Sequence, residues 1–374
     1  MAVIEGRCPV SGDVLVVGMQ EGAIESVARR QSRDTTLPWL LPGLVDLQVN
    51  GYAGHDVNGP GATPESVAAI TQSLAAAGVT TWVPTVITAS EEGITASLRS
   101  ISAARAADPV VARAIPFVHV EGPFLSPHDG PRGAHDLDQI RPVDAEEVAR
   151  WAAHAPIGYV TVSPHTDDAP AQVARIVASG TAVALGHTHA SPEQLLAATD
   201  AGASLCTHLG NGIYAELPRH PNPIWTQLAD DRLTAGFIGD GHHLPPETLV
   251  AMIRAKGRGR AFLVSDSVAL AGCAPGLYHQ PVGGDVELHA SGRLTLANTP
   301  FLAGAAVNLA EVVAYVLAHT PFSLAEVSEL ASGTPATLMQ DRRLGRIQVG
   351  AHADLILVDD AGGVLRVVRG GTEP

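Results

Sequence analysis

Aromatic residues are scarce in this sequence, at 4% of its 374 residues. Basic residues are also few, because 23 Lys and Arg stand against 38 Asp and Glu and leave a net charge of −15. Binding to nucleic acid or to an anionic membrane surface usually needs a basic patch, and single-stranded nucleic acid also needs stacking aromatic side chains. The composition therefore disfavours these partners, and an anionic substrate would need a local positive pocket.

Cysteine is rare as well, with Cys8, Cys206 and Cys273 far apart in the chain. Three such residues form neither a C-x-x-C motif nor a disulfide framework. Residues 1–17 lack a basic flank and a long apolar core, and no apolar run approaches the length that spans a membrane. We therefore expect a cytoplasmic protein.

Apolar residues are abundant by contrast (46%), as are Gly and Pro, at 38 and 27 residues. Between residues 41 and 344, strand-like apolar runs alternate with segments of helical periodicity. The expected strands lie at 41–48, 79–86, 115–121, 158–164, 182–188, 203–208, 233–239 and 261–266. Eight β/α units predict a (β/α)8 TIM barrel of the α/β class. A doubly wound sheet is the weaker alternative, because no G-x-G-x-x-G motif opens a helix.

Both ends of the chain show short strand patterns with weak helical periodicity. Apolar runs such as 14–17 and 355–358 lie next to Gly-containing turns. We therefore predict two domains. One is a small β-sandwich domain formed from residues 1–40 and 345–374, and the other is a catalytic barrel domain formed from residues 41–344.

Four of the expected strands end in a side chain that can bind a metal ion or move a proton: Glu121, His187, His208 and Asp266. The carboxyl ends of barrel strands meet at the face where chemistry is placed. One carboxylate and two imidazoles can hold a divalent ion and leave a position for water, and an aspartate beside that water can take its proton. The alternatives are purely structural roles: His187 as a hydrogen-bonded histidine of the core, and Asp266 as the cap of the following turn. Because four strands end in this way, we predict a mononuclear metal site with a catalytic acid/base.

An ordered set of motifs carries a family resemblance. Residues 42–51 read PGLVDLQVNG, and HVEGPF, GHTHA, THLGN, DGHH and VSD follow in that order before the closing motif at 345–355. The set resembles the N-acetylglucosamine-6-phosphate deacetylase family of the amidohydrolase superfamily over almost the whole chain. Gln48 and Asn50 stand where two-metal members of the superfamily have paired histidines. Neutral amides are poor metal ligands, so the resemblance implies one divalent ion per chain, Zn in the first place with Fe, Co or Mn as alternatives.

The resemblance also implies roles for individual residues. The implied metal ligands are Glu121, His187 and His208, and the implied catalytic residues are Asp266 as acid/base and His135, which would meet the substrate near its amide. The residues implied to bind substrate are Asn211, Gly212, Arg219, His243 and His135. Family members place the arginine across a dimer interface, so a homodimer is expected, with Arg219 in contact with the phosphate of the neighbouring subunit's substrate.

Several positions depart from the family pattern, most of them at the phosphate end. The usual T-H-L-[FY]-N-A-M reads THLGNGI here, and Asp136 follows the motif histidine where Asn is usual. His165 replaces a usual Glu, while His189 and His242 are additional histidines. The roles of these three histidines stay open at this point.

These observations predict metal-dependent hydrolysis of N-acetylglucosamine 6-phosphate to glucosamine 6-phosphate and acetate. One alternative is another N-acyl substrate, such as N-acetylgalactosamine 6-phosphate or an N-acyl amino acid. A second is a non-catalytic sugar-phosphate-binding protein, which would not need all four strand-end residues. A dihydroorotase or hydantoinase is excluded because Gln48 and Asn50 replace the histidines of a two-metal centre.

Overall fold

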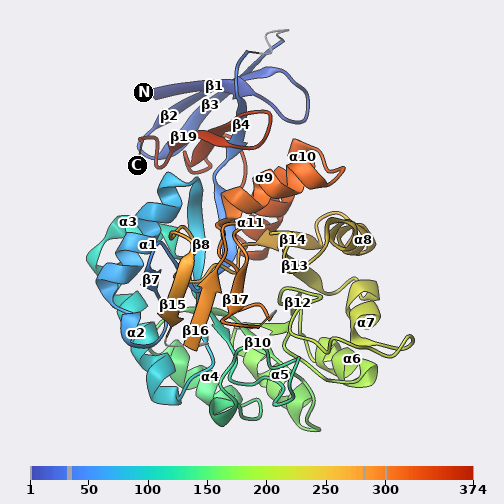
Figure 1. Ribbon diagram of the computed structural model, residues 1–374. Coiled ribbons are helices and arrows are strands. Elements are labelled where there is room, and N and C mark those ends of the chain that lie inside the picture. Colours follow the sequence, from blue (N-terminus) through green and yellow to red (C-terminus); the bar gives the residue numbers. More distant parts are fainter. Residues whose placement is uncertain (1, 32–35, 281–283, 300, 374) are drawn as a thin grey trace.

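The computed structural model describes residues 2–31, 36–280, 284–299 and 301–373, and consists of a barrel with a smaller sheet at one end (Figure 1). All eight predicted barrel strands are present: β5 (Leu44–Val49), β8 (Val79–Ile87), β9 (Val118–Glu121), β10 (Ile157–Val162), β11 (Ala182–Leu185), β12 (Leu205–Cys206), β13 (Thr234–Ile238) and β14 (Ala261–Val264). They are parallel and hydrogen-bonded in the order β14-β13-β12-β11-β10-β9-β8-β5.

The end of the first strand meets the residues that follow the last strand. Val49 forms a parallel bridge with Ser267, and the backbone N–H of Asp266 donates to the carbonyl of Gln48 at 3.0 Å. The sheet is thereby brought round into a nearly closed barrel. The predicted (β/α)8 architecture is confirmed.

Helices surround the barrel and begin where the sequence supplies capping residues. In α1 (Pro64–Ala76) the Thr63 side chain accepts from the N–H of Ser66, and α6 (Pro192–Asp200) begins with a capping box between Ser191 and Gln194. The other helices are α2 (Glu91–Ala107), α3 (Pro109–Ala114), α4 (Ala145–Ala152), α5 (Ala169–Ala178), α7 (Pro223–Ala229), α8 (Pro246–Lys256), α9 (Leu309–His319), α10 (Leu324–Ser328) and α11 (Thr334–Leu338). Short turns of helix are η1 (Gly59–Gly61), η2 (Leu137–Gln139) and η3 (Glu329–Gly333).

The core has two layers around the strands. The inner layer fills the barrel with side chains such as Leu47, Tyr159 and Phe262, while the outer layer packs the other face of the strands against the helices, with Trp82 and Trp151 fully buried. Apolar side chains cover both faces of the strands and stabilise the barrel. The polar side chains of the site lie at the ends of the strands.

The two ends of the chain meet in a second sheet, as predicted. Its six strands are β1 (Ala2–Arg7), β2 (Val14–Gln20), β3 (Ala23–Arg30), β4 (Trp39–Pro42), β18 (Leu355–Val358) and β19 (Val364–Val368), in the order β19-β18-β4-β1-β2-β3. Figure 1 shows both termini at this sheet. The boundaries at 40/41 and 344/345 stay predictions, and residues 1, 32–35 and 374 of the predicted β domain lie outside the described residues.

A third sheet was not predicted from the sequence. It contains β15 (Gly276–Gln280), β16 (Gly284–Leu288) and β17 (Leu294–Leu296), all antiparallel, between β14 and α9. A small pair, β6 (Gly51–Tyr52) and β7 (His55–Asp56), follows β5. The three-stranded sheet lies over the barrel in Figure 1 and contributes to the cavity described below.

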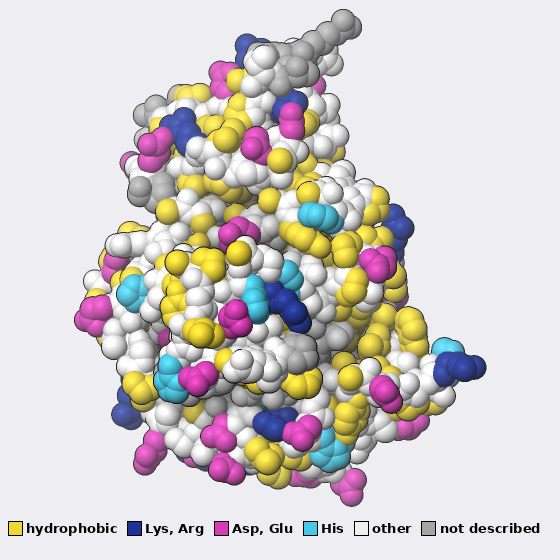
Figure 2. All heavy atoms as spheres, viewed as in Figure 1, with side chains coloured by type: hydrophobic (Ala, Val, Ile, Leu, Met, Phe, Trp, Pro, Cys, Tyr) yellow, Lys and Arg dark blue, Asp and Glu magenta, His cyan; other side chains and the backbone are white. Residues whose placement is uncertain are grey.

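Charged side chains are dispersed over the face of the molecule that Figure 2 shows. On the face shown in Figure 2, Lys and Arg side chains lie singly among Asp and Glu rather than in one basic patch. Among the helices formed by the described residues, none has the length and apolar character to span a membrane.

Candidate active site

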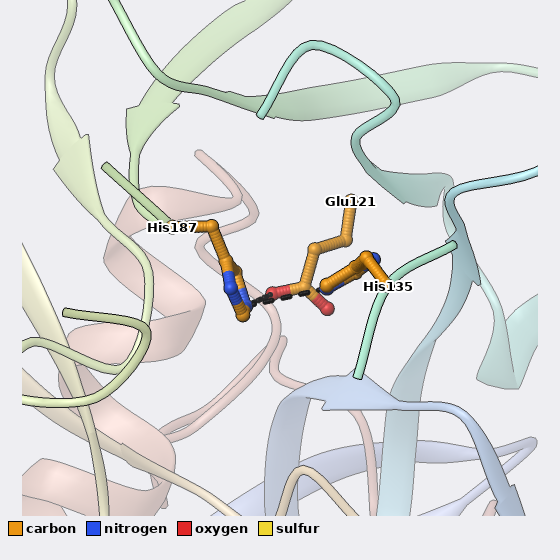
Figure 3. A group of neighbouring side chains, drawn as sticks. All are labelled: Glu121, His135 and His187. Carbon is orange, nitrogen blue, oxygen red and sulfur yellow. Dashed lines mark hydrogen bonds and ion pairs between the residues drawn. The ribbon is translucent and has the colours of Figure 1, made fainter. Parts of the chain in front are cut away.

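The three predicted metal ligands converge at the carboxyl ends of β9, β11 and β12. Oε1 of Glu121 lies 3.0 Å from Nε2 of His208 and 3.3 Å from Nε2 of His187, and the two Nε2 atoms are 3.1 Å apart. All three side chains are buried, and Figure 3 shows Glu121 and His187 pointing toward one another. Residues far apart in the sequence thus present three potential ligand atoms to one point.

Three of the predicted site residues have an unusual backbone conformation. His187, His208 and Asp266 have φ angles of 47°, 26° and 52°, in the left-handed region that side chains other than Gly rarely occupy. The predicted strands 182–188, 203–208 and 261–266 were therefore too long, because a strand cannot continue through this conformation. Such strain is typically found where the surroundings hold a functional side chain in place.

The tautomer of His187 fits a metal site. Its Nδ1 lies 2.8 Å from the carbonyl oxygen of Pro131. A carbonyl can only accept, so Nδ1 donates to it, and Nε2 is the nitrogen that faces Glu121 and His208. Ligands about 2.0–2.1 Å from a tetrahedral ion lie about 3.3 Å from one another, close to the observed separations. The donor set and its spacing therefore fit a zinc-like divalent ion.

The charges of the cluster also favour a cation. Burial opposes ionisation of Glu121, but hydrogen bonds from His187 and His208 outweigh it and hold the pKa of the carboxyl well below its usual range. Burial likewise opposes a charge on His208, but the hydrogen bond to Glu121 raises the pKa of its imidazole. A carboxylate that stays ionised while buried is a strong attractor for a positive ion.

Gln48 contacts the carboxylate of Glu121. Its Nε2 lies 3.2 Å from both carboxylate oxygens of Glu121 and donates to them. The amide thus turns its N–H groups, which cannot bind a metal, toward the carboxylate. That the position of the missing histidines holds no second ion stays a prediction.

Asp266 lies in the same cavity with a hydrogen bond of 2.8 Å from Nδ2 of Asn50 to its Oδ1. Burial, followed by the negative charge of Glu121, raises the pKa of the Asp266 carboxyl to about 6. A carboxyl group with a pKa near neutrality can both accept and return a proton at physiological pH.

His135 lies closer to the ligand cluster than the sequence indicated. Its Nε2 is 3.3 Å from Nε2 of His187, and potential ligand atoms of Glu121, His135 and His187 lie within 4.8 Å of one another (Figure 3). Burial, with a smaller effect from His187, lowers the pKa of the His135 imidazole to about 3. His135 is therefore neutral, and can donate one N–H and accept at its other nitrogen.

A cavity of about 280 Å³ connects these groups. The predicted residues that line it are Glu121, His135, His187, His208, Asn211, Gly212, His243 and Asp266. Arg219 does not line it; this side chain is exposed on the segment before α7, which extends outward in Figure 1. The sequence did not reveal the apolar wall, to which Val286, Leu294 and Leu302 of the three-stranded region contribute.

His243 is oriented by a residue that the sequence reasoning did not assign. Its Nδ1 lies 2.7 Å from Oδ2 of Asp240, whose Oδ1 accepts the backbone N–H groups of His242 and His243. Burial of Asp240 is outweighed by the hydrogen bond and charge of His243, which lower the pKa of the carboxyl to about 2. The signal in the sequence was an aspartate three residues before the motif histidine.

The three histidines with open roles lie outside the cavity lining. His189 stacks on His128 with ring centroids 4.1 Å apart, and His165 lies 4.5 Å from His189. Ser126 bonds to Nδ1 of His189 at 2.6 Å. His242 reaches the carbonyl oxygen of Ser291 at 3.1 Å and so contacts the turn between β16 and β17.

Comparisons with known proteins identify the family of this chain. The model of the amidohydrolase family matches residues 39–373. The N-acetylgalactosamine-6-phosphate deacetylase of Shewanella sp. (strain ANA-3) is 32% identical over 88% of this chain and 81% of that protein. The N-acetylglucosamine-6-phosphate deacetylase of Bacillus subtilis (strain 168) is 29% identical over 95% of this chain and 91% of that protein.

A solved structure extends the likeness to the whole fold. The N-acetyl-D-glucosamine-6-phosphate deacetylase of Mycobacterium smegmatis, a mutant in complex with N-acetyl-D-glucosamine 6-phosphate, has a TM-score of 0.87 and 26% identity, covering 100% of this chain and 99% of that one. The chain therefore belongs to the amidohydrolase family and, within it, to the N-acetylglucosamine-6-phosphate deacetylase family.

Proposed function

We propose that this protein is a metal-dependent deacetylase that hydrolyses N-acetylglucosamine 6-phosphate to glucosamine 6-phosphate and acetate. The observation that carries the proposal is the convergence of Glu121, His187 and His208 within 3.3 Å of one another, in a cavity that Asp266 also lines. A protein that only binds a sugar phosphate has no use for this combination. The relatives named above act, by their names, on substrates of this class.

In the proposed reaction, Glu121, His187 and His208 hold the ion. A divalent ion bound there polarises the amide carbonyl and makes water acidic enough to react near neutral pH. Asp266 removes the proton from the attacking water and then delivers it to the amide nitrogen, because an amine leaves readily only when protonated. His135, which is neutral, donates an N–H to the carbonyl oxygen as negative charge develops on it.

The phosphate end of the substrate needs donors, because the protein as a whole is acidic. Asn211, the N–H of Gly212 and His243 line the cavity and are the donors that we assign to this end. Arg219 is exposed and outside the cavity of its own chain. We therefore propose that it reaches the substrate of a neighbouring subunit in a homodimer.

Exposed apolar side chains support such an interface. Trp225 on α7 and Leu196 on α6 keep 54% and 42% of their surface exposed. Large apolar side chains left exposed to water can mark a contact surface. Both helices belong to the same side of the barrel as the segment that carries Arg219, since β12 and that segment lie between them in the chain.

N-acetylgalactosamine 6-phosphate is the second candidate substrate. The relative from Shewanella, at 32% identity, is named for that substrate. The two sugars differ only in the orientation of one hydroxyl group, which a single hydrogen bond can distinguish. Zinc as the ion and a cytoplasmic location stay predictions from the sequence.

The test is acetate release by the purified protein from four substrates: both N-acetylhexosamines, each with and without 6-phosphate. We expect turnover of the phosphorylated sugars, with N-acetylglucosamine 6-phosphate preferred, and about one divalent ion per chain by elemental analysis. Removal of the ion by a chelator should abolish turnover, and its return should restore it. Absence of turnover with the ion bound would refute the proposal, and two tightly bound ions would refute the mononuclear site.

A further inference from the structure

Asn50 is held rigidly at the mouth of the barrel although it is not a metal ligand in this site. Its backbone N–H donates to the carbonyl oxygen of Ser267 at 2.8 Å, and its own carbonyl accepts from Val57 at 3.0 Å. The residue is buried, with 8% of its surface exposed. Its backbone is therefore fixed on both sides, and the side chain has a defined direction.

Only one end of the side-chain amide is used within the protein. Nδ2 donates to Asp266 at 2.8 Å, whereas Oδ1 has no hydrogen-bond partner among the residues that the structure describes. Asn50 lines the same cavity as Asp266 and the ligand cluster. A buried oxygen without a partner costs free energy, and native proteins usually keep one only where a ligand or water completes it.

The chemistry of the free oxygen restricts what can complete it. Oδ1 is an acceptor, so a phosphate oxygen or a substrate carbonyl cannot bind there, and an N–H or O–H group can. The two heteroatoms of one amide are close together, so a donor on Oδ1 necessarily lies near the carboxylate of Asp266. In the proposed reaction that carboxylate must come within hydrogen-bond reach of the amide nitrogen in order to protonate it.

We propose that Oδ1 of Asn50 accepts the N–H of the scissile amide and so positions the leaving nitrogen beside Asp266. This inference rests on the proposed deacetylase function. Asp266 takes a proton from water as the new C–O bond forms, and returns it to the nitrogen as the C–N bond breaks. The original N–H of the substrate stays hydrogen-bonded to Oδ1 of Asn50 throughout. The amide nitrogen therefore turns its lone pair, and not its hydrogen, toward Asp266.

The alternative occupant of Oδ1 is the attacking water. The two readings differ when the amide is replaced by an ester, because an ester oxygen has no hydrogen to donate while the attacking water is the same. A substrate pair for this comparison is N-acetylglucosamine 6-phosphate and its analogue with a 2-O-acetyl group. The readout is the ratio of kcat/KM for the amide to kcat/KM for the ester.

The variants are Asn50→Leu and the smaller Asn50→Ala, which both remove the acceptor, and Asn50→Asp, which keeps an oxygen there. All three disturb the bond to Asp266, which should slow both substrates. We expect Asn50→Leu and Asn50→Ala to lower the amide-to-ester ratio about 10-fold, the effect of one hydrogen bond, and Asn50→Asp to leave it nearly unchanged. Metal content should stay at the wild-type level in the Leu and Ala variants.

An unchanged ratio in the Leu and Ala variants, with both substrates slowed alike, would overturn the inference. Asn50 would then contact only water or Asp266, and not the amide of the substrate. A wild-type protein that binds two ions per chain, one of which the Leu and Ala variants lose, would also overturn the inference, because Oδ1 would then be a metal ligand. These outcomes leave the deacetylase proposal intact. Failure of the wild-type protein to release acetate from the amide would instead refute the proposed function, and this inference with it.

Discussion

At the scale of single residues, the site depends on side chains placed by backbone that is costly to form. His187, His208 and Asp266 each leave the strand in the left-handed region, which turns the side chain into the cavity. Glycines make this arrangement fit: a Cβ at position 212 would lie 2.8 Å from Nδ1 of His187, and one at 133 would lie 3.2 Å from its Cε1. Small residues around the histidine are therefore part of the site.

Asp266→Asn tests the proton transfer. The substitution keeps the size of the side chain but removes the group that carries the proton. We expect metal content to stay close to one ion per chain and kcat to fall at least about 100-fold. A variant that turns over at the wild-type rate would show that Asp266 is structural.

The pH dependence of the wild-type enzyme should reflect the same group. The pKa of Asp266 is raised from 3.8 to about 6, so the basic form is lost as pH falls through that value. A bound cation adds positive charge nearby and lowers this pKa, so we expect the acid limb of kcat/KM at or below about pH 6. The limb should be absent from the residual activity of Asp266→Asn.

Gly212→Ala tests the fit around His187. The added methyl group displaces the imidazole, and we expect metal affinity to fall about 10- to 100-fold, as when a group that orients a ligand is altered. Gly59→Ala is the matched control, since Gly59 has a φ of 58° against 57° for Gly212 but no atom within 4 Å of the added Cβ. Equal metal affinity in the two variants would mean that contact with His187 is unimportant.

At the scale of elements, β5 and β14 are joined by a buried polar contact. Oδ2 of Asp46 accepts from the hydroxyl of Ser265 at 2.5 Å, and its Oδ1 accepts from the backbone N–H groups of Ser265 and Gln48 at 3.2 and 3.3 Å. Burial outweighs these bonds and raises the pKa of the Asp46 carboxyl to about 7. The contact lies where the barrel closes, between Asp46 of β5 and the residue that follows β14, so we expect its protonation to affect stability.

Asp46→Asn should change how stability depends on pH. A carboxyl whose pKa is raised on folding binds its proton more tightly in the folded state, so its contribution to stability is full at low pH and is lost as pH rises from about 4 through 7. With about 1.4 kcal/mol per pKa unit, the effect is on the order of a few kcal/mol. The thermal midpoint of Asp46→Asn relative to wild type should therefore increase from pH 5 to pH 8. A difference that is constant with pH would contradict this origin.

The strands that the sequence did not predict, β15 to β17, are stabilised by tertiary contacts and lack a clear local pattern of apolar and polar residues. β15 is mostly exposed, and its residues show no clear alternation of apolar and polar character. The sheet is held by Val286, Leu288 and Leu294, which pack against Leu270 and Ala306 outside it. Such strands form because they can cover an apolar surface elsewhere in the fold. That surface cannot be predicted from the local sequence of the strands.

At the scale of the whole molecule, the position of Arg219 leads to a test of shared active sites. Arg219→Ala should raise KM for a 6-phosphorylated substrate about 10- to 150-fold, the effect of a lost charge-assisted contact. The unphosphorylated sugar should be almost unaffected. Equal effects on both substrates would mean that Arg219 does not contact phosphate.

Mixing two impaired variants, assayed with the 6-phosphorylated substrate far below the KM of Arg219→Ala, distinguishes a partner's arginine from the chain's own. In a heterodimer of Arg219→Ala and Asp266→Asn, one site receives an intact aspartate and, if the arginine acts across the interface, an intact arginine. After subunit exchange, an equal mixture should regain about a quarter of wild-type activity, since half of the dimers are mixed and half of their sites are complete. No recovery despite exchange would show that the arginine acts within its own chain.

The sequence alone determined the (β/α)8 barrel, the meeting of the two chain ends, and the four strand-end residues. It could do so because apolar periodicity marks strands and helices locally, and because parallel barrel strands bring their carboxyl ends to one face whatever the loops do. The residues Glu121, His187, His208 and Asp266 follow from these rules without any distance being known.

Only the tertiary structure decided the rest, because it depends on contacts between distant segments. The left-handed turn at His187, the orientation of His243 by Asp240, and the apolar wall from the three-stranded sheet have no local signal of comparable strength. The same holds for the histidines that were left open, since His165 and His189 pack together outside the cavity. The sequence showed Asn50 only as a position that lacks a metal-binding histidine. In the folded protein its Nδ2 donates to Asp266, 216 residues away, and this contact leaves Oδ1 without a partner.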